Sequence, residues 1–314
     1  MSYTKWDSQA AREKAAKGSF AAKAVRKEVY DNNCEIFARG GYTTSDGKDV
    51  VLEADERNAM LDATVVYSQP FSVSDVPMLD SVPRKEVRNE ECLAMAKRLK
   101  DNGYNPAVLN LADLVLACGL YDKGSNAQEE SLCRQTTLSQ NLYQWYEPRH
   151  AAAVNVSFRG KGYPMDERNG GIYAPVKVFR SGQATGFALL DEPWQVAIIS
   201  VAGLDFGKRM GRDKRYATAN HGYTETGREI MREKIRTIYR IALRHGHDAL
   251  VLGALGCGAF DNRPEAVAFL FRQVLTEEEF RKKFRFVGFA ILEGKGPNSG
   301  PKGKFAPFYE LFSK

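Results

Sequence analysis

Residues 249–260 read ALVLGALGCGAF. The first four are apolar and bounded by turn-forming residues, which predicts a buried strand, and an apolar-periodic helix is expected from Pro264. Between them lies a turn rich in glycine, which lets a backbone approach a ligand closely. A strand, a glycine-rich turn and a helix in this order can hold a pyrophosphate on backbone N–H groups. The turn has neither the dinucleotide-binding nor the P-loop glycine spacing, so it predicts a phosphate-binding loop of another kind within an α/β fold.

This glycine loop supplies the first candidate ligand contacts, which are Gly256, Cys257, Gly258, Ala259 and Phe260. The ring of Phe260 could stack on a ribose or a base at the exit of the loop. A phenylalanine of the hydrophobic core is an equal alternative, because Phe is often buried.

A second informative stretch is Gln128-Glu129-Glu130. It follows the apolar run 107–111 and a loop containing Gly119, and a helix is predicted over 127–145. Two adjacent carboxylates at a helix start could divide the work, one orienting a sugar hydroxyl and the other exchanging a proton. The alternative is that both glutamates only complement the helix dipole as first-turn acids. Ser125 with Gln128 three residues later fits a capping box.

The two stretches together resemble the two signature loops of the microbial-type poly(ADP-ribose) glycohydrolases, a family with a macrodomain fold. Residues 128–134 read QEESLCR and residues 252–262 read LGALGCGAFDN. The resemblance extends from about Thr4 to about Leu292. It implies an α/β fold with a macrodomain-like mixed sheet flanked by helices and preceded by an N-terminal helical extension.

The resemblance also implies an ADP-ribose glycosylhydrolase that cleaves the glycosidic bond at the distal ribose of poly- or mono-ADP-ribosylated substrates. It assigns Glu130 as general acid and then base for water, and Glu129 to the ribose hydroxyls. Asn110, at the end of a strand, would lie near the same sugar, and Gly119 and Gln128 would be further ligand contacts. A reader that binds ADP-ribose without turnover is the alternative.

One departure from the family pattern bears on this choice. The family reads Asn-Pro-Gly-Gly-Gly before its Gln-Glu-Glu, whereas residues 116–120 read LACGL here, and the gap of seven residues is kept. Only Gly119 remains of the three glycines. Side chains at Cys118 and Leu120 are therefore expected to narrow the pyrophosphate groove, because a glycine there would let the backbone approach more closely.

Composition limits the partners. The 314 residues carry 45 Lys and Arg against 39 Asp and Glu, a net charge of +6. Much of the excess lies between Lys5 and Lys27, which is typical of a solvated helix face and could also meet a polyanion. A nucleic-acid-binding function has no base-reading motif behind it.

The expected ligand is ADP-ribose, free or attached to a protein or a nucleic acid. The five cysteines form no CxxC and the four histidines no HxxxH, so a zinc site is not predicted, although isolated acidic residues could still hold a magnesium ion. No cofactor is expected. No apolar run reaches membrane-span length. Unpaired scattered cysteines favour a reducing cytoplasmic or nuclear setting. The oligomeric state cannot be read from the sequence.

The chain is predicted as an N-terminal extension over 1–103 and a catalytic core over 104–314, which together form one continuous domain. The extension begins with helices over the first ~37 residues, followed by a hairpin around Ser45-Asp46-Gly47. Further strands are expected at 63–67, 107–111, 172–179, 196–201, 249–253 and 286–292, and further helices at 86–102, 127–145, 226–245 and 264–275.

Overall fold

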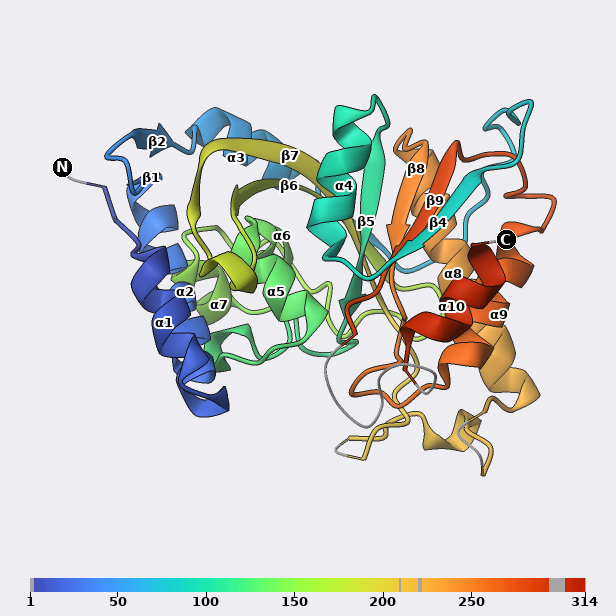
Figure 1. Cartoon of the computed structure of the whole chain (residues 1–314). Helices are drawn as coiled ribbons and strands as arrows, with labels where there is room; N and C mark the ends of the chain where they lie inside the picture. The colour runs from blue at the N-terminus through green and yellow to red at the C-terminus, as the bar shows by residue number, and fades with distance from the viewer. Residues whose placement is uncertain (1–2, 209, 220–221, 294–302, 314) are drawn as a thin grey trace. The chain divides into compact units, whose positions relative to one another are not determined.

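A computed structural model describes residues 3–208, 210–219, 222–293 and 303–313 (Figure 1). Its helices are α1 Ser8–Ala16, α2 Ser19–Arg39, α3 Ala54–Asp62, α4 Cys92–Asp101, α5 Gln128–Gln135, α6 Leu138–Tyr143, α7 Pro148–Ala153, α8 Glu225–Arg244, α9 Pro264–Leu275 and α10 Phe305–Phe312. Its strands are β1 Gly41–Thr43, β2 Asp49–Val51, β3 Val65–Tyr67, β4 Arg84–Arg88, β5 Pro106–Ala112, β6 Gly171–Arg180, β7 Leu189–Ala202, β8 Ala249–Leu252 and β9 Phe286–Ala290.

The predicted fold class is confirmed: seven strands belong to one mixed sheet, and helices flank it. The chain divides into two compact units. The first unit contains residues 1–66, 112–164 and 172–198, and the second contains residues 67–111, 165–171 and 199–314. The predicted boundary near residue 103 stays a prediction.

The second unit is a parallel layer with strand order β5-β8-β9-β4. Ala107 pairs with Leu250, Leu250 with Val287, and Val287 with Lys85. Helix α4 contacts β8 and β9, while α9 packs against both α8 and α10 (Figure 1). Because parallel strands end at the same edge of a sheet, the end of β5 and the glycine loop after β8 come to one edge of this unit.

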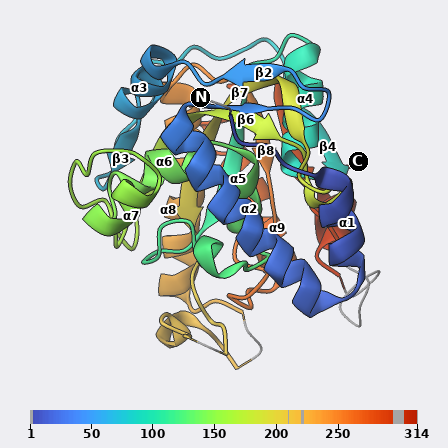
Figure 2. The ribbon, with the colours of Figure 1, turned by 90° about the vertical axis from the view of Figure 1, so that its left-hand side faces the viewer.

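The first unit is built around the N-terminal helices (Figure 2). Helix α1 packs on α2 through Ala11, Val25 and Val29, and Phe187, which lies just before β7, completes this apolar cluster. Gly40 ends α2 with a φ of 72°, which is accessible to glycine without strain. The predicted hairpin is confirmed, since β1 and β2 pair in antiparallel fashion.

Three local predictions are wrong. The helix expected over 86–102 begins only at Cys92, because residues 84–88 pair with β9 as strand β4, and tertiary pairing overrides helix propensity. The helix expected over 127–145 breaks at Thr136, whose backbone is extended and whose hydroxyl bonds to the Leu132 carbonyl. The capping box does not form, since Ala127 is the N-cap of α5 and no side chain caps it.

Neither a membrane-spanning helix nor a cluster of metal-binding side chains is present among the described residues. None of their helices has the length and apolar character needed to cross a bilayer. Nor do three or more of their His, Cys, Asp or Glu side chains gather as a possible metal-binding set.

Candidate active site

Glu129 and Glu130 stand in the first turn of α5, and both are buried, with only 3% and 5% of their surface exposed. Glu129 accepts a hydrogen bond through Oε2 from the N–H of Asp113 at 2.9 Å. Glu130 accepts one through Oε1 from the N–H of Leu120 at 3.1 Å. Acids that only complement a helix dipole would be solvated, whereas these two carboxylates are held by the loop that precedes their helix.

Gly119 makes this arrangement possible. Its φ is +55°, and a Cβ at this position would lie 2.6 Å from Oε1 of Glu130 and 3.5 Å from Oε2 of Glu129. Among the described residues, no hydrogen-bond partner reaches Oε2 of Glu130, although the atom is buried. One oxygen of Glu130 is therefore fixed, and the other is left to exchange a proton or to bind a ligand group.

The stretch that departs from the family pattern keeps a glycine-like backbone. Cys118 has a φ of 62°, a conformation that costs a side-chain-bearing residue about 1–2 kcal/mol. Its thiol is buried beside Cys133 and Tyr143, and burial raises its pKa well above the ordinary value. Leu116 and Leu120 are half-buried, so they are the side chains of this stretch that reach the surface. The predicted narrowing of a pyrophosphate groove stays a prediction.

Two buried arginines hold this loop by donating hydrogen bonds to its backbone carbonyls. Arg134 donates through Nη2 to the Ser125 carbonyl at 2.7 Å, and Arg26 donates through Nε to the Gly124 carbonyl at 2.8 Å. In the described part of the chain Arg134 forms no ion pair with Glu130, and burial lowers its pKa to about 10. Arg134 therefore holds the loop before α5 and does not pair with the candidate catalytic acid.

Asn33, which the sequence did not single out, joins α2 to the carboxylate helix. Its amide nitrogen donates to the hydroxyl of Tyr121 at 2.7 Å and to the carbonyl of Arg134 at 3.0 Å. Its amide oxygen accepts from Nε of the buried Arg180 at 2.6 Å. All these groups are buried, so the N-terminal extension helps to hold the last turn of α5 and the Tyr121 segment before the helix.

The glycine loop is organised by Asn262. Its amide nitrogen lies 2.6, 3.0 and 3.1 Å from the carbonyls of Leu204, Gly256 and Phe260, and its oxygen accepts from the Tyr223 hydroxyl at 2.6 Å. Gly256 has a φ of 73°, and a Cβ there would lie 2.6 Å from the Asn262 amide nitrogen. Asn262 belongs to the quoted signature, but sequence reasoning gave it no role.

The outer part of the loop is open. Gly258 and Ala259 are exposed, whereas Cys257 is buried, and burial raises the pKa of its thiol. Among the described residues, the N–H groups of 258–260 make no hydrogen bond. Successive unpaired N–H groups in a turn form a concave anion-binding site.

Phe260 is half-buried, between the two alternatives drawn from the sequence. The guanidinium of Arg212 lies over its ring at 5.9 Å and pairs with Asp205 at 3.2 Å. The Phe260 carbonyl accepts from the N–H of Phe206 at 2.9 Å. The segment after β7 therefore contacts the exit of the glycine loop.

The remaining candidates are placed as follows. Gln128 is half-buried at the first position of α5. Asn110 is buried in β5 and donates through its amide nitrogen to the Ser200 hydroxyl at 3.0 Å. The structure brings Glu129, Glu130 and Gly119 together in the first unit, and it places the glycine loop in the second.

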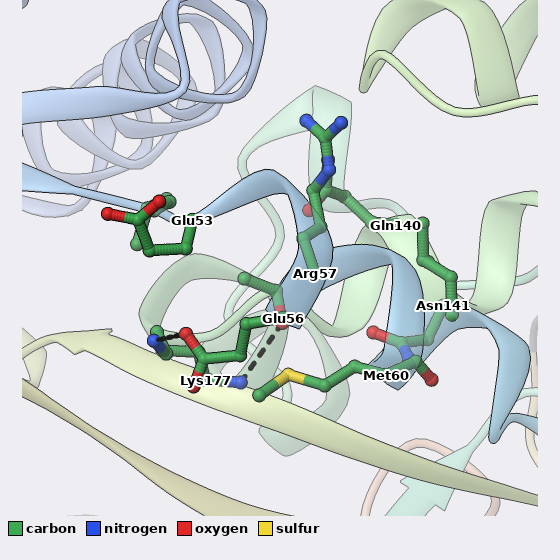
Figure 3. Close-up of a pocket in the computed structure, with 10 residues that line it drawn as sticks. Glu53, Glu56, Arg57, Met60, Gln140, Asn141 and Lys177 are labelled. Carbon is green, nitrogen blue, oxygen red and sulfur yellow. Dashed lines mark hydrogen bonds and ion pairs between the residues drawn. The ribbon is translucent and has the colours of Figure 1, made fainter.

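A small cavity of about 20 Å³ lies in the first unit beside α3, α6 and β6 (Figure 3). Met60, Gln140 and Asn141 line it, together with an ion pair between Glu56 and Lys177. None of the predicted site residues lines this cavity. Its charged lining residues, Glu53, Glu56, Arg57 and Lys177, carry no net charge, so the cavity is not a basic phosphate site.

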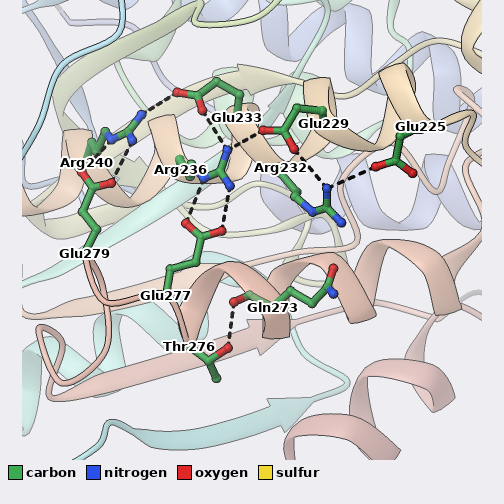
Figure 4. Close-up of polar contacts among 10 residues, drawn as sticks. All are labelled: Glu225, Glu229, Arg232, Glu233, Arg236, Arg240, Gln273, Thr276, Glu277 and Glu279. Carbon is green, nitrogen blue, oxygen red and sulfur yellow. Dashed lines mark hydrogen bonds and ion pairs between the residues drawn. The ribbon is translucent and has the colours of Figure 1, made fainter.

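Three arginines of α8, Arg232, Arg236 and Arg240, are paired with acids (Figure 4). Arg236 donates two hydrogen bonds to Glu277, at 2.8 and 2.9 Å, and one to Glu229 at 2.7 Å. Arg240 binds Glu279 in the same two-pronged way. This face of α8 is therefore neutralised and offers no basic surface to a nucleic acid.

Comparison with known proteins shows that this chain is similar to poly(ADP-ribose) glycohydrolases (PARG) of the microbial type. The model of the microbial-type PARG catalytic domain matches residues 31–181. The poly(ADP-ribose) glycohydrolase of Thermomonospora curvata is similar in structure, with a TM-score of 0.71 and 28% identity over 91% of this chain and 99% of that chain. The resemblance to the microbial-type PARG family is confirmed.

Two ligand complexes of PARG enzymes are also similar. The Thermomonospora curvata enzyme bound to the inhibitor ADP-HPD gives a TM-score of 0.70 at 28% identity, over 91% of this chain and 99% of that chain. The Deinococcus radiodurans enzyme in complex with ADP-ribose gives 0.61 at 26% identity, over 81% of this chain and 96% of that chain. No curated protein matches the sequence. The predicted enzyme class, a PARG-like hydrolase of glycosidic bonds, is confirmed.

Proposed function

We propose that this protein hydrolyses the glycosidic bond at the distal ribose of ADP-ribosylated substrates, with Glu130 as general acid and base. The observation that carries the proposal is the state of the Glu130 carboxylate. It is buried, one oxygen is fixed by the Leu120 N–H, and the other has no hydrogen-bond partner among the described residues. The ADP-ribose and ADP-HPD complexes of the similar PARG enzymes support ADP-ribose as the ligand.

The chemistry follows from this carboxylate. In the first step Glu130 gives a proton to the leaving oxygen while the bond from C1 of the ribose to that oxygen breaks. The positive charge that develops on C1 is shared with the ring oxygen. In the second step the Glu130 carboxylate takes a proton from water as the water oxygen bonds to C1, which restores the acid.

The other predicted residues bind the substrate. Glu129, held by the Asp113 N–H, would accept hydrogen bonds from the ribose hydroxyls. The unpaired N–H groups of 258–260 would bind the pyrophosphate, and the half-buried Phe260 ring would contact the nucleoside. Asn110, Gly119 and Gln128 remain proposed ligand contacts.

The test compares two isosteric variants. Glu130→Gln keeps the shape of the side chain and removes the proton donor, so ADP-ribose affinity should change little while turnover falls by ~10²–10⁴. Glu129→Gln should weaken affinity and turnover together, because its proposed role is to hold the ribose. The measurements are calorimetry with ADP-ribose and release of ADP-ribose from poly- and mono-modified substrates.

Two outcomes would contradict this assignment. A Glu130→Gln protein as active as the wild type would remove Glu130 from the reaction. A folded wild-type protein that binds ADP-ribose and releases none from either substrate would be a reader. The loss of two of the three family glycines, at Cys118 and Leu120, is the feature of this chain that favours the reader.

A further inference from the structure

The C-terminal helix α10 brings a lysine to the glycine loop. The ammonium nitrogen of Lys304 lies 3.8 Å from the point that a Cβ on Gly258 would occupy, and it is the nearest atom there among the described residues that are not neighbours of Gly258 in the chain. Lys304 is the N-cap residue of α10 and makes no side-chain capping bond. Across the described residues no acidic side chain forms an ion pair with it.

The place of Lys304 is fixed by its neighbours. Glu293 accepts a hydrogen bond from the N–H of Phe305 at 2.9 Å, which holds the first residue of α10. A Cβ on Gly303 would lie 1.8 Å from the same carboxylate oxygen, so this approach requires glycine. The lysine is thus carried by a backbone that is anchored on both sides of it.

Packing of α10 on the core secures this anchor. Phe308 and Phe312 are buried, and their rings lie 5.0 and 4.5 Å from the ring of Phe289. Phe308 also contacts Phe271 of α9. Burial of these two aromatic rings removes a large apolar area from water, which stabilises the docked helix. The helix therefore presents Lys304 to the loop as a fixed part of the second unit.

A positive charge beside Gly258 would stabilise an anion bound to the glycine loop. Within the described part of the chain the N–H groups of 258–260 have no hydrogen-bond partner, and Gly258 and Ala259 are exposed, so an anion bound to these groups would lie beside Gly258. We propose that Lys304 is a phosphate-contacting residue, which adds a charge-assisted bond from the C-terminal helix to the diphosphate held by the glycine loop. The inference rests on the proposed function, because it takes the diphosphate of ADP-ribose as the anion.

The test uses Lys304→Met, which keeps the length of the side chain and removes the charge. Calorimetry should show ADP-ribose and ADP both bound about tenfold more weakly, since a hydrogen bond to a charged group is worth about 1.5–3 kcal/mol when fully formed. ADP has the diphosphate without the distal ribose, so an equal loss for both ligands places the effect at the phosphates. Lys304→Arg should keep most of the affinity. Added NaCl should weaken ADP-ribose binding less in Lys304→Met than in the wild type.

Lys100→Met is the matched control, because it removes one exposed lysine of the same unit in the last turn of α4. It should bind both ligands as the wild type does. Equal affinity in Lys304→Met and Lys100→Met would overturn the role of Lys304 and leave the proposed function intact. Equal losses in Lys304→Met and Lys304→Arg would also overturn it, since the charge would not be the cause. A wild-type protein that binds neither ligand would refute the proposed function and this inference with it.

Discussion

Replacing Gly119 with alanine tests the carboxylate geometry most directly. The new Cβ would lie 2.6 Å from Oε1 of Glu130, whereas an ordinary contact begins at 3.4 Å. Oε1 must therefore move by about 0.8 Å, the difference between these two distances. This movement strains or breaks the 3.1 Å hydrogen bond from the Leu120 N–H.

The magnitude has two parts. A displacement of about 1 Å in a catalytic group can cost about 10²-fold in rate, so turnover of Gly119→Ala should fall by about ten- to a hundredfold. The positive φ of +55° adds a backbone cost of about 1 kcal/mol to folding. The assays are release of ADP-ribose from a modified substrate and urea unfolding.

Gly103→Ala is the matched control, because Gly103 has a φ of +75° and nothing lies within 4 Å of its Cβ position. It should lose a similar ~1 kcal/mol of stability through its backbone and keep full turnover. The reasoning is refuted by a Gly119→Ala protein that releases ADP-ribose as fast as Gly103→Ala, since the position of Glu130 would then not matter.

Three further predictions concern the glycine loop at Gly258, the stretch 116–120 that departs from the family pattern, and the buried Lys234. Gly258→Val should weaken ADP-ribose binding at least tenfold, about 1.4 kcal/mol. The melting temperature should not change, since the position has room for a side chain, and equal affinity by calorimetry would remove the loop from the site. A triple mutant with Leu116→Asn, Cys118→Gly and Leu120→Gly should bind ADP-ribose more tightly or release it faster from modified substrates, because it restores the family pattern and relieves the positive φ at 118. A folded triple mutant that does neither would show a loop adapted to its own substrate. Burial lowers the pKa of Lys234 from 10.5 to about 8, so the unfolded chain binds more protons than the folded chain between these values, and stability rises with pH across this window. The unfolding free energy of the wild type relative to Lys234→Met should therefore rise from pH 8 to 10.5 in urea titrations, and a constant difference would contradict the lowered pKa.

The parts of the fold that local patterns determine could be predicted from the sequence. Strand β8, the glycine loop and α9 lie where the apolar run, the glycines and Pro264 indicated. Strand β4 could not be predicted, because residues 84–88 are strand only through their pairing with β9. Thr136 likewise interrupts a helical pattern, because its backbone forms a bridge with Val178 of β6.

The candidate site shows the same division. The sequence identified the two glutamates by their motif, but it could not show that they are buried. Their burial depends on N–H groups of Asp113 and Leu120, which reach them only because the loop between takes positive φ values at Cys118 and Gly119. A non-glycine residue with positive φ carries no sequence signal of its own.

Lys304 is a stronger case of the same limit. Nothing in the sequence near residue 304 indicates a phosphate contact, because the lysine meets Gly258 only after Phe308 and Phe312 have docked α10 on the core. Docking of α10 on the core and phosphate binding at the glycine loop should therefore depend on each other. A substitution that undocks α10, such as Phe312→Ala, should weaken diphosphate binding even though Phe312 itself touches no ligand group, and Lys304→Met in that background should then add little, since the two changes remove the same contact.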